Sequence, residues 1–535
     1  MKLSAAIANC LWATANVPAL ARFHRALERP EEAQSAWLHR TLKANIDCAY
    51  GKKYRFDEIR TYEEFSNRVP LVDYEDIEPW VKRIMRGENQ VLTTEKVTHL
   101  IPTSGSTRAR KLIPFTNDLK REFNAAIGPW ILELFQSQPS LVCGPAYWSI
   151  TPAFDFDTFE ESRVPIGFEE DAAYLGGWRK HLVQSVMAVP SALGKMFDSE
   201  SFRYATLLCL LRQRDLRLIS VWHPSFLTLL LDALPVHWDN LLSDVRTGEF
   251  TFQKSISDRL NAKLSAKPLP ARENELRSAD PRKPETIWPA LRLISSWGDG
   301  PAAMPLHELQ SRFPNVVFQS KGLLATEACV TVPLQGRKPV ALCSHFFEFI
   351  DESGKLKRVH ELCADQTYEV VVTTGGGLWR YRLKDCVTVD GFVGRTPSLR
   401  FVGRSGNVSD LCGEKLSDSF VSGVIERAVA EMSARPRFVM LAPEQTHQGW
   451  RYVLYFEGNA PIDLVAIEEG LRANPHYAYC RRLGQLSELR LHRVRSKGFE
   501  IFLNREISEG RRAGDVKPCF FSKKWGWTEW FEKGG

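Results

Sequence analysis

The sequence predicts a large N-terminal α/β domain followed by a small α+β domain. Three observations support this prediction: apolar residues at helical spacing in the first hundred residues, strands that alternate with helices through the middle, and a change of pattern near residue 404. The chain has 535 residues, of which 44% are hydrophobic. That is too long for one compact core, and the apolar content suits a folded protein of more than one domain.

The first hundred residues are expected to be helical. Leu38, Leu42 and Ile46 recur at helical spacing. Thr61 followed by Glu64 fits a capping box, in which each side chain accepts a hydrogen bond from a backbone N–H at the helix start. Phe65 then begins an apolar face.

Residues 1–21 leave two interpretations open. Small apolar residues, Lys2 and the Ala19–Ala21 sequence resemble an export signal. Asn9, Asn16 and Pro18 interrupt the apolar stretch, which fits a packed first helix equally well.

Strands and helices alternate between residues 200 and 320. Arg217–Trp222, Leu291–Trp297 and Val316–Gln319 are strand-like runs, and Phe226–Leu234 is a helical stretch between two of them. The segment Ser265–Pro289 is rich in proline and charge. It is either a domain boundary or an exposed excursion inside one domain.

The pattern changes to β-structure over Thr367–Val393, with a glycine turn at Gly375–Gly377. After Phe401–Gly406 the chain predicts a further helix and then a strand at Tyr452–Phe456. We therefore divide the chain into a domain of residues 1–403 and one of residues 404–535. The apolar face of the predicted helix consists of Phe420, Val421, Val424, Ile425, Ala428 and Val429.

Composition argues against several classes of protein. Seventy Lys and Arg against 64 Asp and Glu give a net charge of +6, without the basic stripe typical of a nucleic-acid binder. No run of about 18 apolar residues predicts a membrane span. The 11 cysteines form no Cys-x-x-Cys pair, which argues against a zinc site or a disulfide framework and fits a reducing cytoplasm.

Five short segments combine polar residues that can bind a nucleotide, phosphate or metal ion. Hydroxyls and backbone N–H groups beside a glycine can surround phosphate oxygens, a carboxylate can hold Mg²⁺, and an Asp after a strand can accept hydrogen bonds from ribose hydroxyls. The candidates are Thr103, Ser104, Gly105, Ser106, Thr107 and Lys111; Thr326 and Glu327; Tyr381 and Asp385; Arg404 with Gly403 and Gly406, followed by Lys415; and Lys517 in Gly514–Pro518.

Each segment also has an ordinary interpretation when it is taken alone. The first is then a Ser/Thr-rich turn, and the Thr-Glu pair is the start of a helix. The Tyr381–Asp385 segment is then a solvated strand face, the glycine pair a simple turn, and the late lysine a surface residue.

The order and spacing of the five segments resemble the adenylate-forming superfamily, which includes acyl-CoA synthetases, luciferases and peptide-synthetase adenylation domains. Tyr381-Arg382-x-x-Asp385 matches its ribose motif fully, whereas Leu323 replaces the aromatic residue of its Tyr-x-x-Thr-Glu motif. One branch, the auxin-responsive acyl acid amido synthetase family, is more similar still. That similarity rests on Lys111–Thr116, Val69-Pro70-Leu71 with Tyr74, Gly87-Glu88, Gly413-Glu414-Lys415 and Gly514–Pro518.

This resemblance implies a large domain of the adenylate-forming type with a β-barrel-like part, and a small mobile C-terminal domain. It implies ATP and Mg²⁺ as cofactors, and a carboxylic acid and an amine, such as an amino acid, as substrates. We expect a monomer without nucleic-acid or membrane partners.

The resemblance also implies roles for individual residues. Thr103–Lys111 would hold phosphate, Thr326 and Glu327 would serve phosphate and Mg²⁺, and Asp385 would bind ribose with Tyr381, Arg404 and Lys415 nearby. Lys517 would reach the α-phosphate when the small domain closes.

The acyl site is predicted at the end of the strand Arg217–Trp222, because ligands of α/β sheets bind at the carboxyl ends of strands. Its candidates are Trp222, His223, Ser225 and Phe226. Core packing is the alternative for this group, and His223 fits a packed histidine better than a catalyst. Two rival functions stay open: an acid–CoA ligase of the same superfamily, and an inactive descendant that only binds nucleotide or acid.

Overall fold

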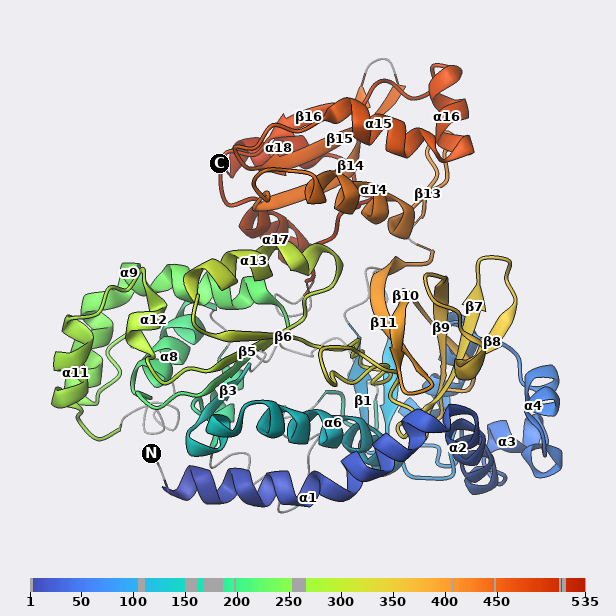
Figure 1. Cartoon of the computed structure of the whole chain (residues 1–535). Coiled ribbons are helices and arrows are strands. Elements are labelled where there is room, and N and C mark those ends of the chain that lie inside the picture. Colours follow the sequence, from blue (N-terminus) through green and yellow to red (C-terminus); the bar gives the residue numbers. More distant parts are fainter. Residues whose placement is uncertain are drawn as a thin grey trace.

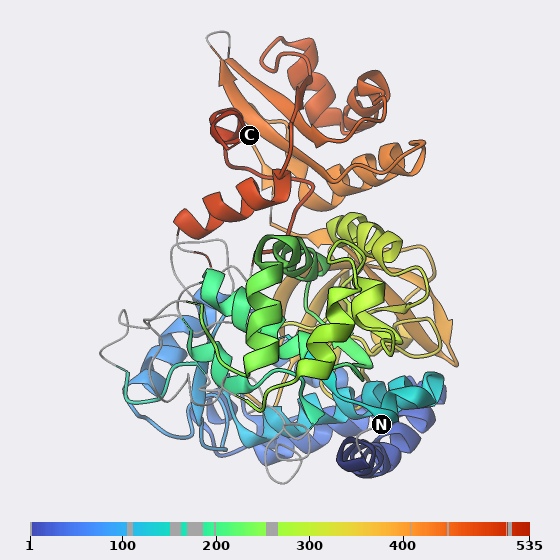
Figure 2. The ribbon, with the colours of Figure 1, turned by 90° about the vertical axis from the view of Figure 1, so that its left-hand side faces the viewer.

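The computed structural model describes residues 3–103, 111–149, 162–167, 186–196, 199–252, 266–406, 408–446, 449–509, 511 and 516–534. A large lower part holds the N-terminal helices and two sheets, and the C-terminal segment forms a smaller lobe above it (Figure 1). Figure 2 shows the same arrangement after a quarter turn. The mixed α/β class predicted from the sequence is confirmed.

Helices form the first part of the chain, as predicted. Thr61 and Glu64 make both hydrogen bonds of the capping box at the start of α4. In α1 the amide of Asn9 donates to the carbonyl oxygens of Val142 and Gly144, so the polar residues that interrupt the apolar stretch are satisfied inside a packed helix. The helices are α1 (Leu3–Glu28), α2 (Pro30–Ala44), α3 (Ala49–Lys53), α4 (Tyr62–Arg68) and α5 (Tyr74–Met85).

A four-stranded parallel sheet forms the centre of the large part. Its order is β3-β4-β5-β6, and the three predicted strand-like runs are its last three strands. Successive residues of each strand face opposite sides, so Ile219 and Ile294 pack in one core cluster while Leu218 and Leu293 pack in another. The strands are β3 (Ala146–Trp148), β4 (Leu218–Ser220), β5 (Leu293–Ser296) and β6 (Val317–Ser320).

Helices cover both faces of this sheet. Helix α6 (Asn117–Ser137) packs with α1 on one face, and α8 (Ser199–Leu211) with α9 (Pro224–Thr247) on the other (Figure 1). The remaining helices here are α11 (Pro270–Arg277), α12 (Pro284–Ile287) and α13 (Ala303–Arg312). Leu276 and Ile287 pack in the same core as α9. The proline-rich segment that contains them therefore belongs to this part of the chain and does not mark a domain boundary.

A five-stranded antiparallel sheet forms the β-rich part. Its order is β11-β10-β9-β7-β8, and the edge strands β8 and β11 do not pair with each other. The strands are β7 (Phe346–Asp351), β8 (Leu356–Arg358), β9 (Thr367–Thr373), β10 (Tyr381–Val393) and β11 (Thr396–Arg404). A separate hairpin of β1 (His99–Pro102) and β2 (Leu112–Phe115) precedes α6.

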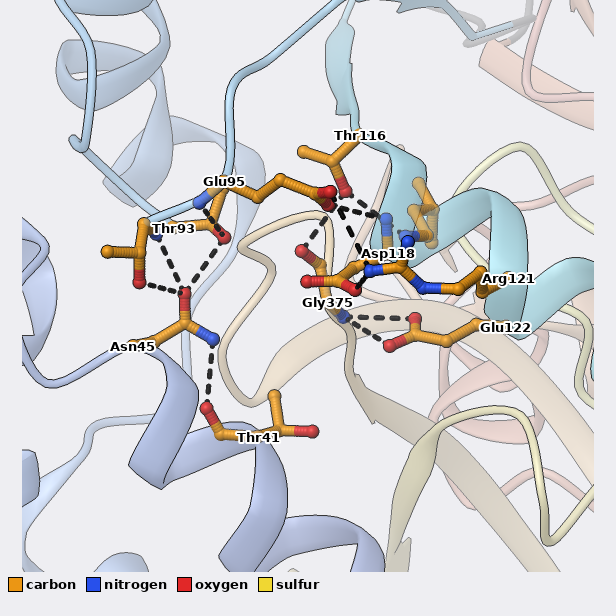
Figure 3. A network of polar contacts seen from close by, with 11 residues as sticks. Thr41, Asn45, Thr93, Glu95, Thr116, Asp118, Arg121, Glu122 and Gly375 are labelled. Carbon is orange, nitrogen blue, oxygen red and sulfur yellow. Dashed lines mark hydrogen bonds and ion pairs between the residues drawn. The ribbon is translucent and has the colours of Figure 1, made fainter.

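A polar network fixes the glycine turn between β9 and β10 against α6 (Figure 3). The Gly375 N–H donates to both oxygens of Glu122 at 3.0 Å, and the Thr116 hydroxyl donates to the Gly375 carbonyl at 3.2 Å. Glu95 accepts a hydrogen bond from the Asp118 N–H at the start of α6. A Cβ at Gly375 would lie 2.4 Å from the Glu122 Oε1, so a larger residue would displace the carboxylate that binds the turn. The network therefore holds the turn that leads into β10.

The C-terminal lobe is an α+β unit around a three-stranded sheet of order β14-β15-β16. Its first helix, α14, buries Val421, Val424 and Ile425, as predicted from the helical spacing. Its elements are β12 (Val408–Ser409), β13 (Leu416–Ser417), α14 (Asp418–Ala430), β14 (Phe438–Thr446), β15 (Gly449–Glu457), α15 (Leu464–Arg472), α16 (Pro475–Arg482), β16 (Arg490–Arg493), α17 (Gly498–Ser508) and α18 (Trp527–Lys533).

Gly403 lies where β11 approaches this lobe. Its φ is +147°, and a Cβ there would lie 2.9 Å from the backbone of Ser419 in α14. A larger residue would therefore force the strand and the helix apart.

Candidate functional site

One cavity of about 870 Å³ collects most of the predicted site residues. It is bounded by the carboxyl ends of the parallel strands, by β10 and β11, and by the C-terminal tail. A smaller recess of about 60 Å³ adjoins it and adds His223. The predicted residues that line the cavity are Thr103, Lys111, Trp222, Thr326, Glu327, Tyr381, Asp385, Arg404 and Lys517.

Asp385 and Arg404 form an ion pair across two neighbouring strands. They are register partners of β10 and β11, and the Arg404 Nε lies 2.9 Å from the Asp385 Oδ1. Arg404 also donates to the carbonyl oxygen of Leu383 at 3.2 Å. The negative charge of Asp385, followed by that of Glu327, raises the pKa of Arg404. The two motifs that carry Asp385 and Arg404 are thus adjacent in space, and one oxygen of Asp385 is already engaged.

Glu327 lies in a tight turn beside this pair. The Ala325 N–H donates to the Ala328 carbonyl, so the Thr-Glu pair lies in a turn and does not begin a helix. Burial raises the pKa of Glu327, while the charges of Arg404 and Lys111 oppose that rise. A cation bound here would favour the ionised carboxylate.

The predicted phosphate loop joins β1 to β2. The Thr103 N–H donates to the Lys111 carbonyl at 2.9 Å and closes the base of the loop. The ammonium of Lys111 lies 5.6 Å from the ring centre of Tyr74, whose hydroxyl oxygen accepts from the Leu112 N–H. Ser104, Gly105, Ser106 and Thr107 lie outside the described residues.

Tyr381 begins β10 and is almost completely buried. The extended segment around Val69-Pro70-Leu71 runs beside it, and Val72 pairs with Tyr381 in a parallel bridge. Burial raises the pKa of the Tyr381 hydroxyl, and the charge of Glu327 adds to this rise. The upstream Val-Pro-Leu sequence thus supports the strand that carries the ribose motif.

Lys517 reaches the cavity from the C-terminal tail. It is solvent-accessible, and its ammonium lies 4.2 Å from the ring centre of Trp297. Burial and, to a smaller extent, the positive charge of Lys517 together lower the pKa of His223 to about 3. Gly514 and Asp515 of the same motif lie outside the described residues. The lysine that is most distant in sequence is therefore brought to the other site residues.

Three predicted residues do not line the cavity in this structure. The Ser225 N–H and hydroxyl contact the ring nitrogen of His223 at the start of α9, so this pair caps the helix. Phe226 packs against the core beside α8 and α9. Lys415 is exposed between β12 and β13. Of the four residues predicted for the acyl site, Ser225 and Phe226 lie in the first turn of α9. Trp222 lines the cavity and His223 lines its recess.

Sequence reasoning missed much of the cavity wall. Trp130 comes from α6, Trp148 from the end of β3, Trp297 from the end of β5 and Lys321 from the residue after β6. The strand ends could have been found by the rule that located Trp222. Trp130 could not have been found by that rule, because it lies within α6, whose sequence pattern is that of an ordinary core helix.

No group of three or more His, Cys, Asp or Glu side chains that could hold a metal occurs in the described part of the chain. Mg²⁺ is usually bound by one or two carboxylates together with substrate phosphates. The half-buried carboxylate of Glu327, which lines the cavity together with Lys111, fits that mode. No helix of the described residues is both long and apolar enough to cross a membrane.

Three family models match successive parts of the chain. They are the GH3 family N-terminal domain over residues 19–318, the central domain over residues 339–404 and the C-terminal domain over residues 420–524. The chain belongs to the GH3 family. The central-domain match ends at Arg404, the residue that pairs with Asp385.

Curated relatives of this GH3 chain include plant proteins that match most of it. A putative indole-3-acetic acid-amido synthetase GH3.10 of Oryza sativa subsp. japonica is 25% identical, over 76% of this chain and 85% of the relative. Indole-3-acetic acid-amido synthetase GH3.2 of Arabidopsis thaliana is 24% identical, over 83% of this chain and 87% of the relative.

Solved structures share the fold. AtGH3.15 acyl acid amido synthetase in complex with 2,4-DB matches with a TM-score of 0.83 at 19% identity, over 97% of this chain and 96% of that one. A 2-hydroxyisobutyryl-CoA ligase in the postadenylation state matches with a TM-score of 0.53 at 13% identity, over 94% and 90%. The fold of this GH3 member is therefore that of the adenylate-forming ligases.

Proposed function

We propose that this protein is a ligase that adenylates a carboxylic acid with ATP and transfers the acyl group to an amine, such as an amino acid. The observation that carries the proposal is the single cavity that joins Lys111, Glu327, Asp385 and Arg404 to an aromatic wall, with Lys517 reaching in from the tail. The names of the curated relatives support the same reaction class.

ATP is needed because a carboxylate has no good leaving group. Direct attack of an amine on the carboxylate carbon would have to expel an oxide ion. A carboxylate oxygen instead attacks the α-phosphorus of ATP and expels pyrophosphate, which gives an acyl-adenylate. The amine then attacks the carbonyl carbon, the C–O bond to AMP breaks, and the amine gives up its proton. The products are an amide, AMP and pyrophosphate.

The residues of this chain suit the charges that these steps create. Negative charge grows on the α-phosphate oxygens as the α-phosphorus is attacked, and fixed cations stabilise it. We assign that task to Lys517, with Arg404 held in place by Asp385. The free oxygen of Asp385 would accept from the ribose. The Thr103–Lys111 loop and Thr326 would hold phosphate oxygens, and Glu327 would hold Mg²⁺, which supplies further positive charge to the phosphates when bound.

We also propose that residues 1–403 and 404–535 act as two domains. Gly403 and Gly406 both have positive φ and flank Arg404, at the entrance to the C-terminal lobe. A rotation after Arg404 would withdraw Lys517 once the adenylate has formed and admit the amine. We infer further that the protein works in the cytoplasm, where its 11 free cysteines stay reduced.

The acceptor distinguishes the amide reaction from a coenzyme A ligase with the same first step. A purified sample would receive ATP, Mg²⁺, a panel of acids, and either amino acids or coenzyme A. We expect an acyl-amino acid by mass spectrometry and no thioester with coenzyme A. A thioester as sole product would overturn the amide assignment and leave adenylation standing. If no acid released AMP, the chain would be a non-catalytic binder.

A further inference from the structure

A buried histidine that belongs to none of the predicted segments connects two turns beside the site. His345 lies just before β7, and its side chain is completely buried. Its Nε2 atom accepts a hydrogen bond from the Cys329 N–H at 3.1 Å, and its Nδ1 atom lies 3.0 Å from the Glu122 Oε2. Glu122 in turn accepts from the Gly375 N–H (Figure 3). One chain of hydrogen bonds therefore runs from the Gly375 turn to Cys329.

The partners of His345 determine which ring nitrogen carries the proton. A backbone N–H can only donate, so the Nε2 atom that faces Cys329 must be unprotonated. Nδ1 then carries the proton and donates it to Glu122. Burial raises the pKa of Glu122, and the hydrogen bonds from His345 and Gly375 oppose that rise. The pair is thus a neutral imidazole and a carboxylate, each with one orientation that satisfies its neighbours.

At its other end the pair holds the turn that carries Glu327. Cys329 closes this turn by pairing with Leu324 in an antiparallel bridge. The Cys329 N–H donates to His345, and its carbonyl oxygen lies 3.2 Å from the Ser344 hydroxyl. Two consecutive residues therefore contact both polar backbone groups of Cys329, two positions after Glu327. The turn is fixed from outside as well as by its own hydrogen bonds.

The imidazole has a rigid support of its own. The amide of Gln34 donates to the His345 carbonyl at 2.7 Å, and its oxygen accepts from the Phe347 N–H at 2.8 Å. The rings of Phe123 and Phe347 pack edge-on against the imidazole. A side chain that is locked in this way can hold a functional group in place without touching the ligand itself.

We propose that His345, oriented by Glu122, is a positioning residue for the nucleotide site. It holds the Glu327 carboxylate where that group can bind Mg²⁺, and it ties this turn to the strand that carries Asp385. The proposal rests on the proposed function. The Gly375 turn leads into β10, so one buried pair sets the separation between the two carboxylates. Mg²⁺ demands nearly ideal octahedral geometry, so even a small displacement of Glu327 should weaken its binding.

Two substitutions separate the two hydrogen bonds of His345. The amide of glutamine reaches the position of Nε2, so His345→Gln keeps an acceptor for the Cys329 N–H. The shorter amide of asparagine reaches only the position of Nδ1. His345→Asn therefore keeps a donor for Glu122 and leaves the Cys329 N–H without its acceptor. Both variants remove the same imidazole, so a loss of packing affects them alike.

The test measures ATP affinity by isothermal titration with and without Mg²⁺. The ratio of the two affinities reports the metal carboxylate, whereas ATP alone reports the ribose and phosphate contacts. We expect His345→Asn to lower this ratio by at least about fivefold, the lower end of the cost of one unsatisfied buried donor. ATP binding without Mg²⁺ should barely change, and His345→Gln should keep a ratio close to that of the wild type.

The carboxylate partner is tested in the same assay. Glu122→Gln keeps the shape of the side chain but places a donor where His345 and Gly375 need an acceptor, so it should lower the ratio as well. Glu133→Gln is the matched control. Glu133 also lies on α6 and accepts a backbone N–H, from Gln335, so its variant should behave as the wild type.

The position of the ring proton supplies a readout that does not depend on binding. In protein with ¹⁵N-labelled histidine, the NMR signals of His345 are identified by their absence in either His345 variant. We expect a neutral ring that is protonated on Nδ1 at neutral pH.

The positioning role is overturned if the wild-type ring carries its proton on Nε2 or is charged. It is also overturned if His345→Asn keeps the full effect of Mg²⁺, or if the asparagine and glutamine variants lose that effect equally. AMP release is assayed separately. Wild-type protein that binds ATP with Mg²⁺ as expected, but releases AMP with no acid, would refute the ligase function alone.

Discussion

Replacing Lys517 by alanine is expected to slow formation of the acyl-adenylate by at least ~100-fold, the scale of losing one electrostatic contact to a transition state. The lysine lies in the cavity, 4.2 Å from the ring centre of Trp297, although it is far along the chain from the other site residues. Its charge would stabilise negative charge that grows only during attack, so ATP affinity should barely change. Acid-dependent pyrophosphate release measures the rate.

The second half-reaction supplies the decisive comparison for Lys517. With a pre-made acyl-adenylate and the amine, Lys517→Ala should form amide at close to the wild-type rate, because the proposed rotation would have withdrawn the lysine by then. Lys533→Ala is the matched control, since that lysine is exposed on α18 and pairs with Glu529. If Lys517→Ala slows amide formation from the pre-made adenylate as much as it slows adenylate formation, the rotation is refuted and Lys517 has only a general structural role.

Asp385→Ala should weaken ATP binding by at least tenfold. Two charge-assisted hydrogen bonds from the ribose hydroxyls to the free oxygen of Asp385 would be lost, each worth about 1.5–3 kcal/mol. The change also removes the ion pair that orients Arg404 at 2.9 Å. Isothermal titration with ATP measures the affinity, and the melting temperature shows whether the variant is folded.

Asp385→Asn separates charge from shape at this position. It keeps one oxygen acceptor and the size of the side chain, so we expect a loss between those of wild type and alanine. Unchanged ATP affinity in a folded Asp385→Ala protein would remove Asp385 from the nucleotide site.

Local patterns predicted most of the architecture. The capping box at Thr61, the parallel strands and the helix that carries Val421 follow from hydrogen bonding and apolar periodicity within a few residues. The pairing of Asp385 with Arg404 required two motifs to meet across β10 and β11, and only the family resemblance implied it before the register was known.

The aromatic wall of the cavity, where we propose that the acyl group binds, could not be predicted in the same way. Ser225 and Phe226 follow the strand β4, but both lie in the first turn of α9, where Ser225 contacts the cap residue His223 and Phe226 packs against the core. Trp130 and Lys321 lie far apart in the sequence, so no local spacing reveals that the Lys321 ammonium lies near the Trp130 ring. The position of Lys517 likewise depends on how the C-terminal tail folds back.

The most direct test of adenylation follows an oxygen atom. An acid that supports AMP release would be labelled with ¹⁸O in both carboxylate oxygens and turned over with ATP and the amine acceptor. If the carboxylate attacks the α-phosphorus, the bridging oxygen leaves with AMP, and mass spectrometry will find one ¹⁸O in each AMP and one in the amide. AMP without label, or label in inorganic phosphate together with ADP, would contradict an acyl-adenylate.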